Sequence, residues 1–385
     1  MATSLSLPTG EAKLLRVIVL VVLVGLAVAL PLAAADDRGL ADAQQRATVN
    51  AGSLRTASGP IVITKGGVYT GNWVSTSPSA PAILIDTSES VTIVGSIVVN
   101  MAGGTLIESP YDVPANLTIT RSTAIGGDGR FVNAENFKSV AIRNCTIIKT
   151  GGIKLVGGVE GSSVVVTRNR QRNVQRGPGG GDRQFIQFAT VTEATIDVSW
   201  NEVVNTYGNS DPEDLVSVYH SAHVRVHDNY FQHQSKPGNA YNTSSQNGIT
   251  IEGDSFDNEV WNNQVVDGLG IGVFAADGAH DNYIHDNRIV QDGFLPDGKT
   301  RIGNGYRALR IRPGGANNHA HGNVVGYMNR DGDRRDGLLD GAPEGNEREW
   351  SNNRHLRRPI TWKTELNESR IWRTKLAAHG VRVGA

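Results

Sequence analysis

The amino-acid sequence predicts an all-β solenoid, in which one short unit is repeated along a continuous core. A short motif recurs along the chain, its copies alternate apolar and polar residues, and β-branched Val, Ile and Thr are frequent in them. The clearest copy, Val224–Phe231, reads apolar, any, apolar, two polar residues, Asn, any, apolar. Successive copies lie 22 to 36 residues apart, a period typical of solenoids.

The repeated Asn predicts a turn that is bonded from coil to coil. An Asn tolerates the left-handed backbone of a tight turn, and its amide can bond to the Asn of the next coil. Close copies are Val140–Ile147 around Asn144, Ile196–Val203 around Asn201 and Ile284–Ile289 around Asn287. Looser copies centre on Asn169, Asn263, Asn323 and Asn353, with Ser122 and Ser96 at the same offset before them.

A second short strand is predicted within each period. We expect one coil to contain a strand, the Asn turn, a loop and this second strand, with the coils paired in parallel. The second strands are predicted at Ile153-Lys-Leu, Ile186-Gln-Phe, Val216-Ser-Val, Ile249-Thr-Ile, Ile271-Gly-Val and Leu309-Arg-Ile.

The repeats Val-His-Asp-Asn, Ile-His-Asp-Asn and Val-Trp-Asn-Asn resemble those of right-handed parallel β-helix repeat proteins, the superfamily that includes pectate lyases. The resemblance covers Ser58 to Leu356. It implies one single-stranded right-handed parallel β-helix over residues 59–356, with short N- and C-terminal caps. This fold carries lyases, hydrolases, esterases, epimerases and non-catalytic adhesins, so it does not fix the reaction.

Residues 1–35 have the pattern of an export signal. Lys13 and Arg16 precede an uncharged run of 14 residues, Val17–Leu30, which is followed by Ala33–Ala35. A run of this length is short for a membrane span and suits a signal core, with cleavage before Asp36. The expected location is secreted or cell surface, without a stable membrane span after cleavage; an uncleaved anchor is the alternative.

The two ends of the repeat region have compositions of their own. Residues 36–58 are polar and predict a cap or linker, with a short helix at Gly39–Val49 over the first coil. Residues 357–385 are basic and contain Trp362 and Trp372, which predicts an opposite cap; a disordered or partner-binding tail is the alternative. We expect a monomer.

Charge and cysteine content exclude some function classes. The net charge of −1 provides no overall field for binding nucleic acid. Cys145 is the one cysteine, so it cannot form an internal disulfide, and its place beside a turn Asn favours a packing role.

The second strands present outward rows of side chains. When these strands are aligned on their inward residues, one outward row reads Lys154, Gln187, Ser217, Thr250, Gly272 and Arg310, and the other reads Val156, Ala189, Tyr219, Glu252, Phe274 and Arg312. Neighbouring coils lie ~4.8 Å apart, so one sugar unit could reach several members of a row. The long loops at 205–212, 232–246 and 291–306 could form the walls of a carbohydrate groove.

These rows suit β-elimination or C5 epimerisation on a uronate polysaccharide. Elimination needs a cation for the carboxylate, a base for the C5 proton and an acid for the departing oxygen. Arg310 or Arg312 could supply the cation, Tyr219 or His220 the base, and Glu252 or Tyr219 the acid; the alternative is that these are ordinary surface residues. The predicted substrate contacts are Lys154, Gln187, Ser217, Thr250, Phe274 and Asp254.

Two other function classes stay open. A non-catalytic carbohydrate-binding or surface protein is one. A glycoside hydrolase is the other, with Glu252 and Asp254 as its carboxyl pair, since an i, i+2 spacing on a strand gives ~6.6 Å. Asp214 is expected ~16 Å from Glu252 along the strand direction, which is too far for such a pair.

Signature motifs of the related enzymes are absent. The sequence has neither the Trp-Ile-Asp-His of pectate lyases nor the Gly-His-Gly and Arg-Ile-Lys of polygalacturonases. The segment Gly181–Phe188 is similar to the pectinesterase nucleophile segment, but Gln184 stands where that family has Asp, which argues against an esterase.

No resident metal or cofactor is predicted. His227 and His285 precede Asp-Asn in the repeat and are therefore predicted turn residues, which leaves no tight zinc spacing. Asp331–Gly337 is acidic, but Arg335 occupies the fifth position of a calcium-loop template. Calcium is kept as an alternative because lyases of this fold often use it.

Overall fold

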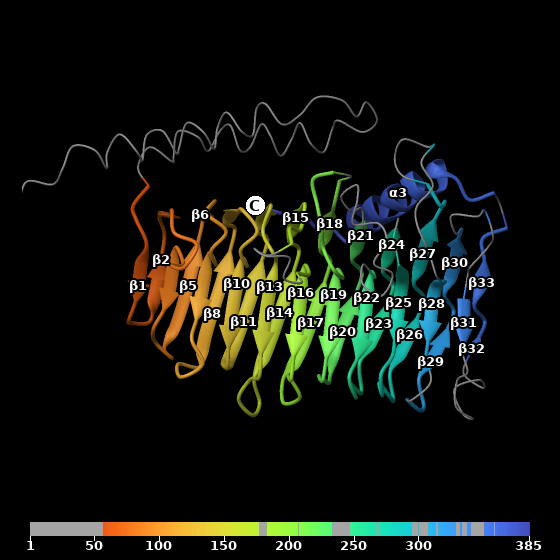
Figure 1. The fold of residues 1–385 in the computed structure, drawn as a ribbon, viewed down its shortest axis with the longest axis horizontal. Helices are drawn as coiled ribbons and strands as arrows, with labels where there is room; N and C mark the ends of the chain where they lie inside the picture. The colour runs from red at the N-terminus through yellow and green to blue at the C-terminus, as the bar shows by residue number, and fades with distance from the viewer. Residues whose placement is uncertain are drawn as a thin grey trace, which may run out of the picture. The chain divides into compact units, whose positions relative to one another are not determined.

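The structure, a computed structural model, describes residues 57–176, 183–206, 208–232, 247–266, 268, 270–294, 299, 307–312, 315–328, 332, 337–339, 350–357 and 359–385. Gly59–Ala385 form one compact unit of stacked coils (Figure 1). The predicted signal peptide, the predicted helix at Gly39–Val49, and most of the 232–246, 291–306 and 331–337 segments lie outside the described residues.

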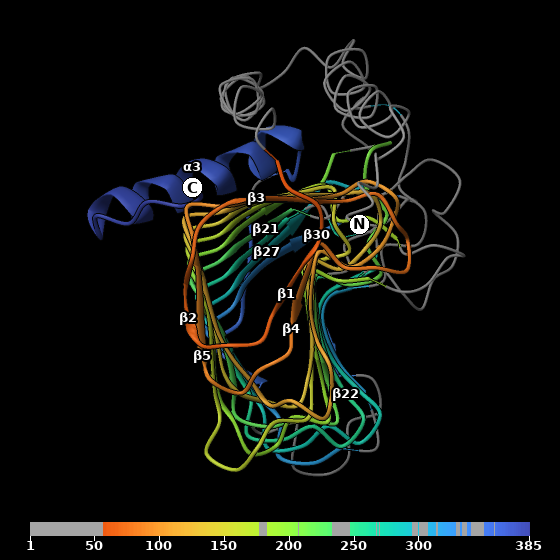
Figure 2. The same cartoon turned by 90° about the vertical axis from the view of Figure 1, so that its left-hand side faces the viewer.

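Each coil contributes one strand to each of three sheets (Figure 2). The first sheet consists of β1 (Ile61–Ile63), β4 (Ile83–Ile85), β7 (Ile107–Ser109), β10 (Val132–Glu135), β13 (Ile153–Val156), β16 (Ile186–Ala189), β19 (Val216–Tyr219), β22 (Ile249–Glu252), β25 (Ile271–Ala275), β28 (Arg307–Ile311) and β31 (Gly337–Leu339). The second consists of β2 (Gly67–Tyr69), β5 (Ser90–Val94), β8 (Ala115–Thr120), β11 (Phe137–Arg143), β14 (Ser163–Thr167), β17 (Thr195–Ser199), β20 (Val224–His227), β23 (Glu259–Trp261), β26 (Tyr283–His285), β29 (His319–His321) and β32 (Trp350–Ser351). The third consists of β3 (Asn72–Ser75), β6 (Ile97–Asn100), β9 (Thr123–Gly126), β12 (Thr146–Ile148), β15 (Arg170–Arg172), β18 (Glu202–Val204), β21 (Tyr230–Gln232), β24 (Gln264–Val266), β27 (Arg288–Gln291), β30 (Val324–Tyr327) and β33 (Arg354–His355).

All neighbouring strands in these sheets pair in parallel, and each pairs with the equivalent strand one coil away. This is the architecture of a right-handed parallel β-helix, which confirms the predicted fold. The predicted second strands are those of the first sheet. The third sheet was not predicted, because its strand follows the Asn turn directly and is short, for example Tyr230–Gln232 in β21.

The predicted ladder is present at the turn between the second and third sheets. Asn229 Nδ2 donates to Asn263 Oδ1 at 2.9 Å, and Asn201 Nδ2 donates to Asn229 Oδ1 at 3.0 Å. The same Nδ2-to-Oδ1 contact joins Asn169 to Asn201, Asn263 to Asn287, Asn287 to Asn323 and Asn323 to Asn353. Each coil is therefore bonded to the next through a buried amide, as well as through its sheets.

Two details of the turn prediction were wrong. The left-handed residue is the one before the ladder Asn, such as Asp228 with φ of 56°, because the ladder residue itself must point its amide into the stack. In the Val140 coil the ladder position is therefore held by Cys145, not by Asn144, whose φ is 53°. Cys145 is fully buried, its backbone N–H donates to Asn169 Oδ1 at 2.9 Å, and burial raises the pKa of its thiol to about 12, which confirms a packing role.

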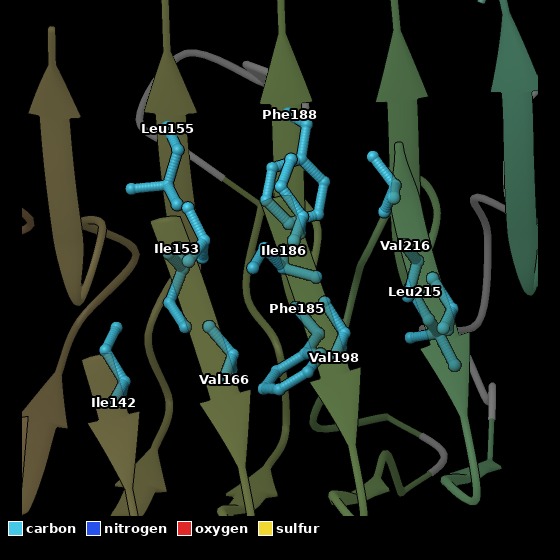
Figure 3. Packing of buried hydrophobic residues seen from close by; sticks show 14 of the residues in the cluster. Ile142, Ile153, Leu155, Val166, Phe185, Ile186, Phe188, Val198, Leu215 and Val216 are labelled. Carbon is cyan, nitrogen blue, oxygen red and sulfur yellow. The ribbon is translucent and has the colours of Figure 1, made fainter. Parts of the chain in front are cut away.

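The core fills the space between the sheets with the inward residues of each strand. Ile153 and Leu155 from the first sheet meet Ile142 and Val166 from the second, all fully buried (Figure 3). Phe185 and Phe231 place their ring centroids 6.2 Å apart across the core. Because inward and outward residues alternate, this packing fixes which side chains face solvent.

The C-terminal segment that was predicted to be a cap forms helix α3 (Trp362–Ala378), which lies along the outer face of the third sheet. Glu368 receives Arg288 Nε and Nη2 at 2.6 and 2.7 Å, and the Trp372 indole N–H donates to the Asp228 carbonyl at 2.9 Å. After the helix the chain continues to the β12 coil, where the Ala385 N–H donates to Thr146 Oγ1 at 2.9 Å. Among the described residues, α3 included, none forms a helix with the length and apolar character required to span a membrane.

Candidate functional site

The outward rows of the first sheet follow the predicted register up to β22. Lys154, Gln187, Ser217 and Thr250 are successive partners in one row, and Tyr219 is the partner of Glu252 in the other. In β25 the prediction was shifted by two residues, because Val273, not Ile271, pairs with Ile249. Phe274 therefore replaces Gly272 in the row of Thr250 and Arg310. Both Ile271-Gly-Val and Val273-Phe-Ala have the apolar, any, apolar pattern, so the pattern could not choose between them.

His220 and Asp254 form a pair at the end of these strands. His220 directly follows β19 with φ of 47°, and its backbone N–H donates to the Glu252 carbonyl at 3.2 Å. Its Nδ1 contacts Asp254 Oδ1 in a short hydrogen bond. A carboxylate on Nδ1 fixes the ring orientation and leaves Nε2 as the nitrogen able to accept a proton.

Asp254 was predicted to lie on the strand beside Glu252, and it does not. Gly253, with φ of 63°, ends β22, and Asp254 itself has φ of 51°. A side chain at Gly253 would approach His220 Nε2 to 3.0 Å and Tyr219 Cε2 to 3.1 Å. The turn therefore lets Asp254 reach His220 and removes the strand spacing on which the Glu252–Asp254 hydrolase pair was based.

Glu252, beside the His220–Asp254 pair, has a raised pKa. Partial burial raises its pKa above the ordinary 4.5, the negative charge of Asp277 raises it further, and His220 lowers it in part. Asp277 follows β25 and was not predicted as a site residue. A raised pKa favours the protonated form of Glu252, which is the form that can donate a proton.

Two arginines converge on one aromatic ring at the next coils. The guanidinium carbons of Arg310 and Arg312 lie 5.9 and 5.8 Å from the Phe274 ring centroid. Arg312 Nη1 also lies 3.9 Å from Asp277 Oδ1, and 46% of the Arg312 side chain is exposed. Phe274 is itself buried, so it supports the arginines and does not offer an open face to a sugar, as the prediction had assumed.

The floor of the site contains a buried carboxyl group, Asp214, which the sequence interpretation left out of the candidate site. Asp214 is 4% exposed, and its Oδ1 accepts the Asn247 N–H at 2.9 Å. Burial raises its pKa well above the ordinary value, aided by the charges of Glu213 and Glu252 and opposed by hydrogen bonds from the Asn247 N–H and the Thr250 hydroxyl. The predicted distance of ~16 Å followed the strand direction only; the side chain reaches across to Thr250 on the next coil.

Of the other predicted substrate contacts, Ser217 and Thr250 are buried, whereas Lys154 and Gln187 lie together further toward the N-terminus. Ser217 and Thr250 are 2% and 1% exposed and belong to the floor. Gln187 accepts Arg130 Nη2 at 3.2 Å. Lys154 is half-buried, and burial lowers the pKa of its ammonium, with Arg130 acting in the same direction. Lys154 and Gln187 therefore lie with Arg130 in a separate group at the N-terminal side of the site.

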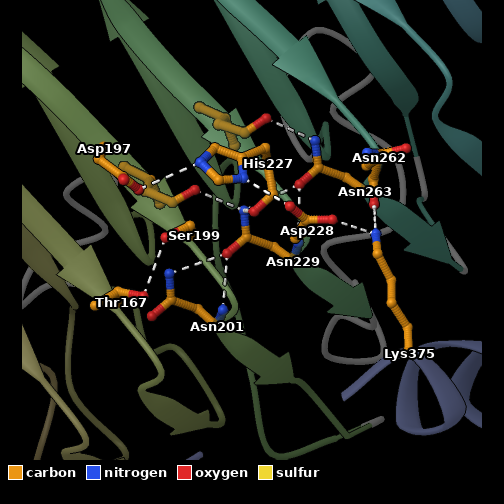
Figure 4. A network of polar contacts seen from close by, with 12 residues as sticks. Thr167, Asp197, Ser199, Asn201, His227, Asp228, Asn229, Asn262, Asn263 and Lys375 are labelled. Atoms are coloured by element: carbon orange, nitrogen blue, oxygen red, sulfur yellow. Dashed lines mark hydrogen bonds and ion pairs between the residues drawn. The ribbon is translucent and has the colours of Figure 1, made fainter. Parts of the chain in front are cut away.

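His227 and His285 were predicted as turn residues of the repeat, but they are the last residues of β20 and β26, directly before the turn. His227 Nδ1 contacts Asp228 Oδ2 at 2.8 Å (Figure 4). The His227 ring stacks on Trp261 with centroids 4.1 Å apart. Burial lowers the pKa of His227, but hydrogen bonds to Asp197 and Asp228 outweigh it and raise the pKa to about 9. Within the described part of the chain, no three His, Cys, Asp or Glu side chains are grouped as metal ligands.

Comparisons with known proteins returned no match: no family model and no curated protein matches the sequence, and no solved structure matches the chain. The resemblance to parallel β-helix proteins is thus supported by the repeat and by the architecture. Function has to be argued from the site itself.

Proposed function

We propose that this protein is an exported carbohydrate-active protein that acts on an acidic, uronate-containing polysaccharide by β-elimination or C5 epimerisation. The observation that carries the proposal is the His220–Asp254 pair beside Glu252, whose pKa is raised. An imidazole ring and a carboxyl group whose pKa is raised thus lie close together. The two arginines on Phe274 supply positive charge on the same sheet.

The residues can be assigned to the steps of elimination. Arg310 or Arg312 pairs with the uronate carboxylate and stabilises the negative charge that develops when C5 loses its proton. His220 Nε2 takes the C5 proton, the electron pair forms the C4–C5 double bond, and the C4–O bond breaks. Glu252 donates its proton to the departing oxygen. The coils of Glu252 and Arg312 are two steps apart, ~10 Å, which a uronate and an arginine side chain can bridge.

Epimerisation uses the same first step and a different second one. After His220 removes the C5 proton, a proton returns to C5 from the opposite face, and no C–O bond breaks. Tyr219 is the candidate donor, because it is the register partner of Glu252 and carries a hydroxyl group in the same outward row. Tyr219 is 42% exposed, so its hydroxyl is accessible to a substrate.

Export is part of the proposal and is supported by the sequence of residues 1–35. A 14-residue uncharged core with Ala33–Ala35 after it suits signal cleavage before Asp36. Intact-mass measurement of protein recovered outside the cytoplasm tests this point: a mass that still includes Met1 contradicts cleavage.

The deciding experiment is a screen of the purified protein against a panel of uronate polysaccharides. Elimination gives products that absorb in the ultraviolet, hydrolysis gives reducing ends without that absorbance, and epimerisation exchanges the C5 proton with solvent. Glu252→Gln, which cannot donate the same proton, should reduce elimination by about 10²-fold or more. The control Glu193→Gln changes an exposed carboxyl group remote from the site row. If a polymer is bound but never altered, a non-catalytic binding function replaces this proposal.

One observation favours hydrolysis as a second candidate. The Asp214 carboxyl group receives the hydroxyl of Thr250, which stands two residues before Glu252 on the same strand face, a spacing of ~6.6 Å. Both carboxyl groups have raised pKa values, and the charge of Glu252 is one of the causes that raise the pKa of Asp214; two carboxyl groups that share a site are what a glycosidase requires. Reducing ends that disappear in both Asp214→Asn and Glu252→Gln would establish this second candidate.

A further inference from the structure

The exposed face of α3 carries a strong local positive charge that the candidate site does not use. Residues 354–385 contain eight lysines and arginines and two glutamates, a net charge of +6 in a chain whose total is −1. The basic residues are therefore concentrated in the segment that lies along the third sheet. The sequence predicted this segment to be a cap, with a disordered or partner-binding tail as the alternative.

The helix sorts its charges by face. Both of its carboxyl groups are used toward the body of the protein: buried Glu368 pairs with Arg288, and Glu365 Oε1 accepts the Asp292 N–H at 2.6 Å. Lys375 is also turned inward, where its ammonium donates to the Asn262 carbonyl at 2.9 Å and pairs with Asp228. No carboxyl group is left on the outward side of α3.

The outward side holds unpaired cations. Lys363, Arg370 and Arg373 are exposed, and none of them has a carboxylate of another described residue within 4 Å; Arg373 lies at the edge of this face, where its charge lowers the pKa of Glu202. Lys363 and Arg370 are seven residues apart, which places them on one line along the helix, ~10.5 Å apart. Arg382 after the helix and Arg354 and Arg357 before it are exposed as well. We name Lys363, Arg370, Arg373 and Arg382 the α3 cation face.

We propose that the α3 cation face is a second binding surface for the acidic polysaccharide, outside the catalytic sheet. This rests on the proposed function for the identity of the polymer. A row of cations on a rigid helix complements a chain with regularly repeated carboxylates. Each contact is weak alone, but a polymer held at two places on one protein gains effective concentration at each.

The structure disfavours two other polyanionic partners. A helix that enters a membrane surface needs a row of apolar side chains on its free face, and here the large exposed apolar residue is Trp362 alone, at the helix start. This chain has a pI near 6.8, so the patch lacks the support of the overall positive charge that is common in nucleic-acid-binding domains. An acidic polysaccharide needs neither an apolar face nor an overall basic charge.

The test compares two triple variants that lose the same formal charge. Lys363→Gln/Arg370→Gln/Arg373→Gln removes the α3 cations, and the control Arg121→Gln/Lys138→Gln/Arg143→Gln removes three exposed cations from the N-terminal coils. Binding of fluorescently labelled polygalacturonate is measured over a range of salt concentrations. The α3 variant should bind at least about tenfold more weakly at low salt and show a shallower salt dependence, because fewer counterions are released. The control should bind as the wild type does.

A second measurement separates this proposal from the proposed function. Turnover of short uronate oligomers, too short to span both places, should be equal in the α3 variant and the wild type. Equal polymer binding by wild type and α3 variant, equal losses in both triple variants, or no polymer binding by the wild type would each overturn the proposal. So would tighter, α3-dependent binding of duplex DNA or of anionic vesicles, which would identify another partner class. Equal unfolding temperatures in all three proteins confirm that the surface changes leave the fold intact.

Discussion

Two histidines of one coil, His220 and His227, are placed in opposite environments. His227 lies between Asp197 and Asp228 and stacks on Trp261, with 18% of its side chain exposed. His220 has one carboxylate partner and 41% exposure, and it follows a strand whose outward row changes chemistry from coil to coil. The comparison teaches that the repeat builds structure. Where neighbouring coils carry similar aromatic rings, as around His227, the histidine is held by stacking and by two carboxylates. Where the coils differ, as around His220, the histidine is more exposed and has one carboxylate partner.

The largest expected effect on turnover comes from replacing His220, the more exposed of the two histidines. His220→Asn should reduce turnover of the uronate substrate by about 10³-fold, since a general base contributes roughly 10² to 10⁴ to the rate. His227→Asn is the matched control and should retain turnover within a few-fold at a temperature where it is folded. Equal losses in the two variants would show that the two histidines do not differ as we argue. Steady-state kinetics by ultraviolet absorbance gives both numbers.

Arg312→Ala tests the arginine that we assign to the uronate carboxylate, directly after β28. Loss of one donor that stabilises developing charge costs about 3 kcal/mol, or about a hundredfold in rate. Arg225→Ala removes an exposed cation of the second sheet and should leave the rate unchanged. A normal rate for Arg312→Ala, with a loss for Arg310→Ala instead, would move the carboxylate to the other arginine.

Asn229→Ala tests the ladder that holds both histidines in place. The change removes donation to the Val198 carbonyl at 2.8 Å and both side-chain bonds of Asn229 to the ladder, and it leaves the buried Asn201 backbone N–H without the Oδ1 acceptor that it has at 2.8 Å. We expect a loss of about 3 kcal/mol in the free energy of unfolding, measured in urea, because each unsatisfied buried group costs roughly 1 to 3 kcal/mol. Asn367→Ala on the exposed side of α3 is the control. A loss below 0.5 kcal/mol for Asn229→Ala would contradict a structural ladder.

His227 should make the free energy of unfolding depend on pH, with a decrease as the pH rises. Its pKa is about 9 in the folded state, above the ordinary 6.5, so its contribution is complete below pH 6.5 and is lost as pH rises through 9. The rise of about 2.5 pKa units corresponds to at most about 3.4 kcal/mol. His227→Gln should therefore be less stable than the wild type at pH 6 and nearly equal to it at pH 10 in urea unfolding. A constant difference across that range would mean that charge is not the source.

The smallest effect is expected on the outer rings of the second sheet. Tyr283 is 44% exposed and stacks on His319 with ring centroids 4.4 Å apart. Tyr283→Ser should cost about 0.5 to 1 kcal/mol of stability and leave turnover unchanged. A clear fall in turnover or in polymer binding would assign a functional role to the second sheet and weaken the contrast between the two faces.

The fold was predictable because its signals are local and repeated. Alternation marks each strand, and the Asn offset marks each turn, so an error in one coil, such as the choice of Asn144 over Cys145, does not change the architecture. The third sheet was missed because three-residue strands after the turn leave little room for an alternating pattern.

The site was predictable only in part, because it depends on departures from the repeat. Tyr219, His220 and Glu252 were found and do cluster, since they follow from strand register. The turn at Gly253 sends Asp254 to His220, and Asp214 reaches across a coil to Thr250. The spacing along one strand predicts neither of these two contacts, because each joins side chains of two neighbouring coils.

The C-terminal segment changes how the stack should respond to force. A stack whose coils are bonded only to their neighbours frays from its ends, one coil at a time. Here the chain leaves the coil of β33, runs along the third sheet as α3, and is pinned at Thr146 in the coil of β12, a contact between residues 239 positions apart. A load applied at Ala385 must first break this pin and peel the helix from the sheet before any coil can unwind. The segment should therefore delay the unwinding of the last coil under load, and with it the loss of the coils around His220.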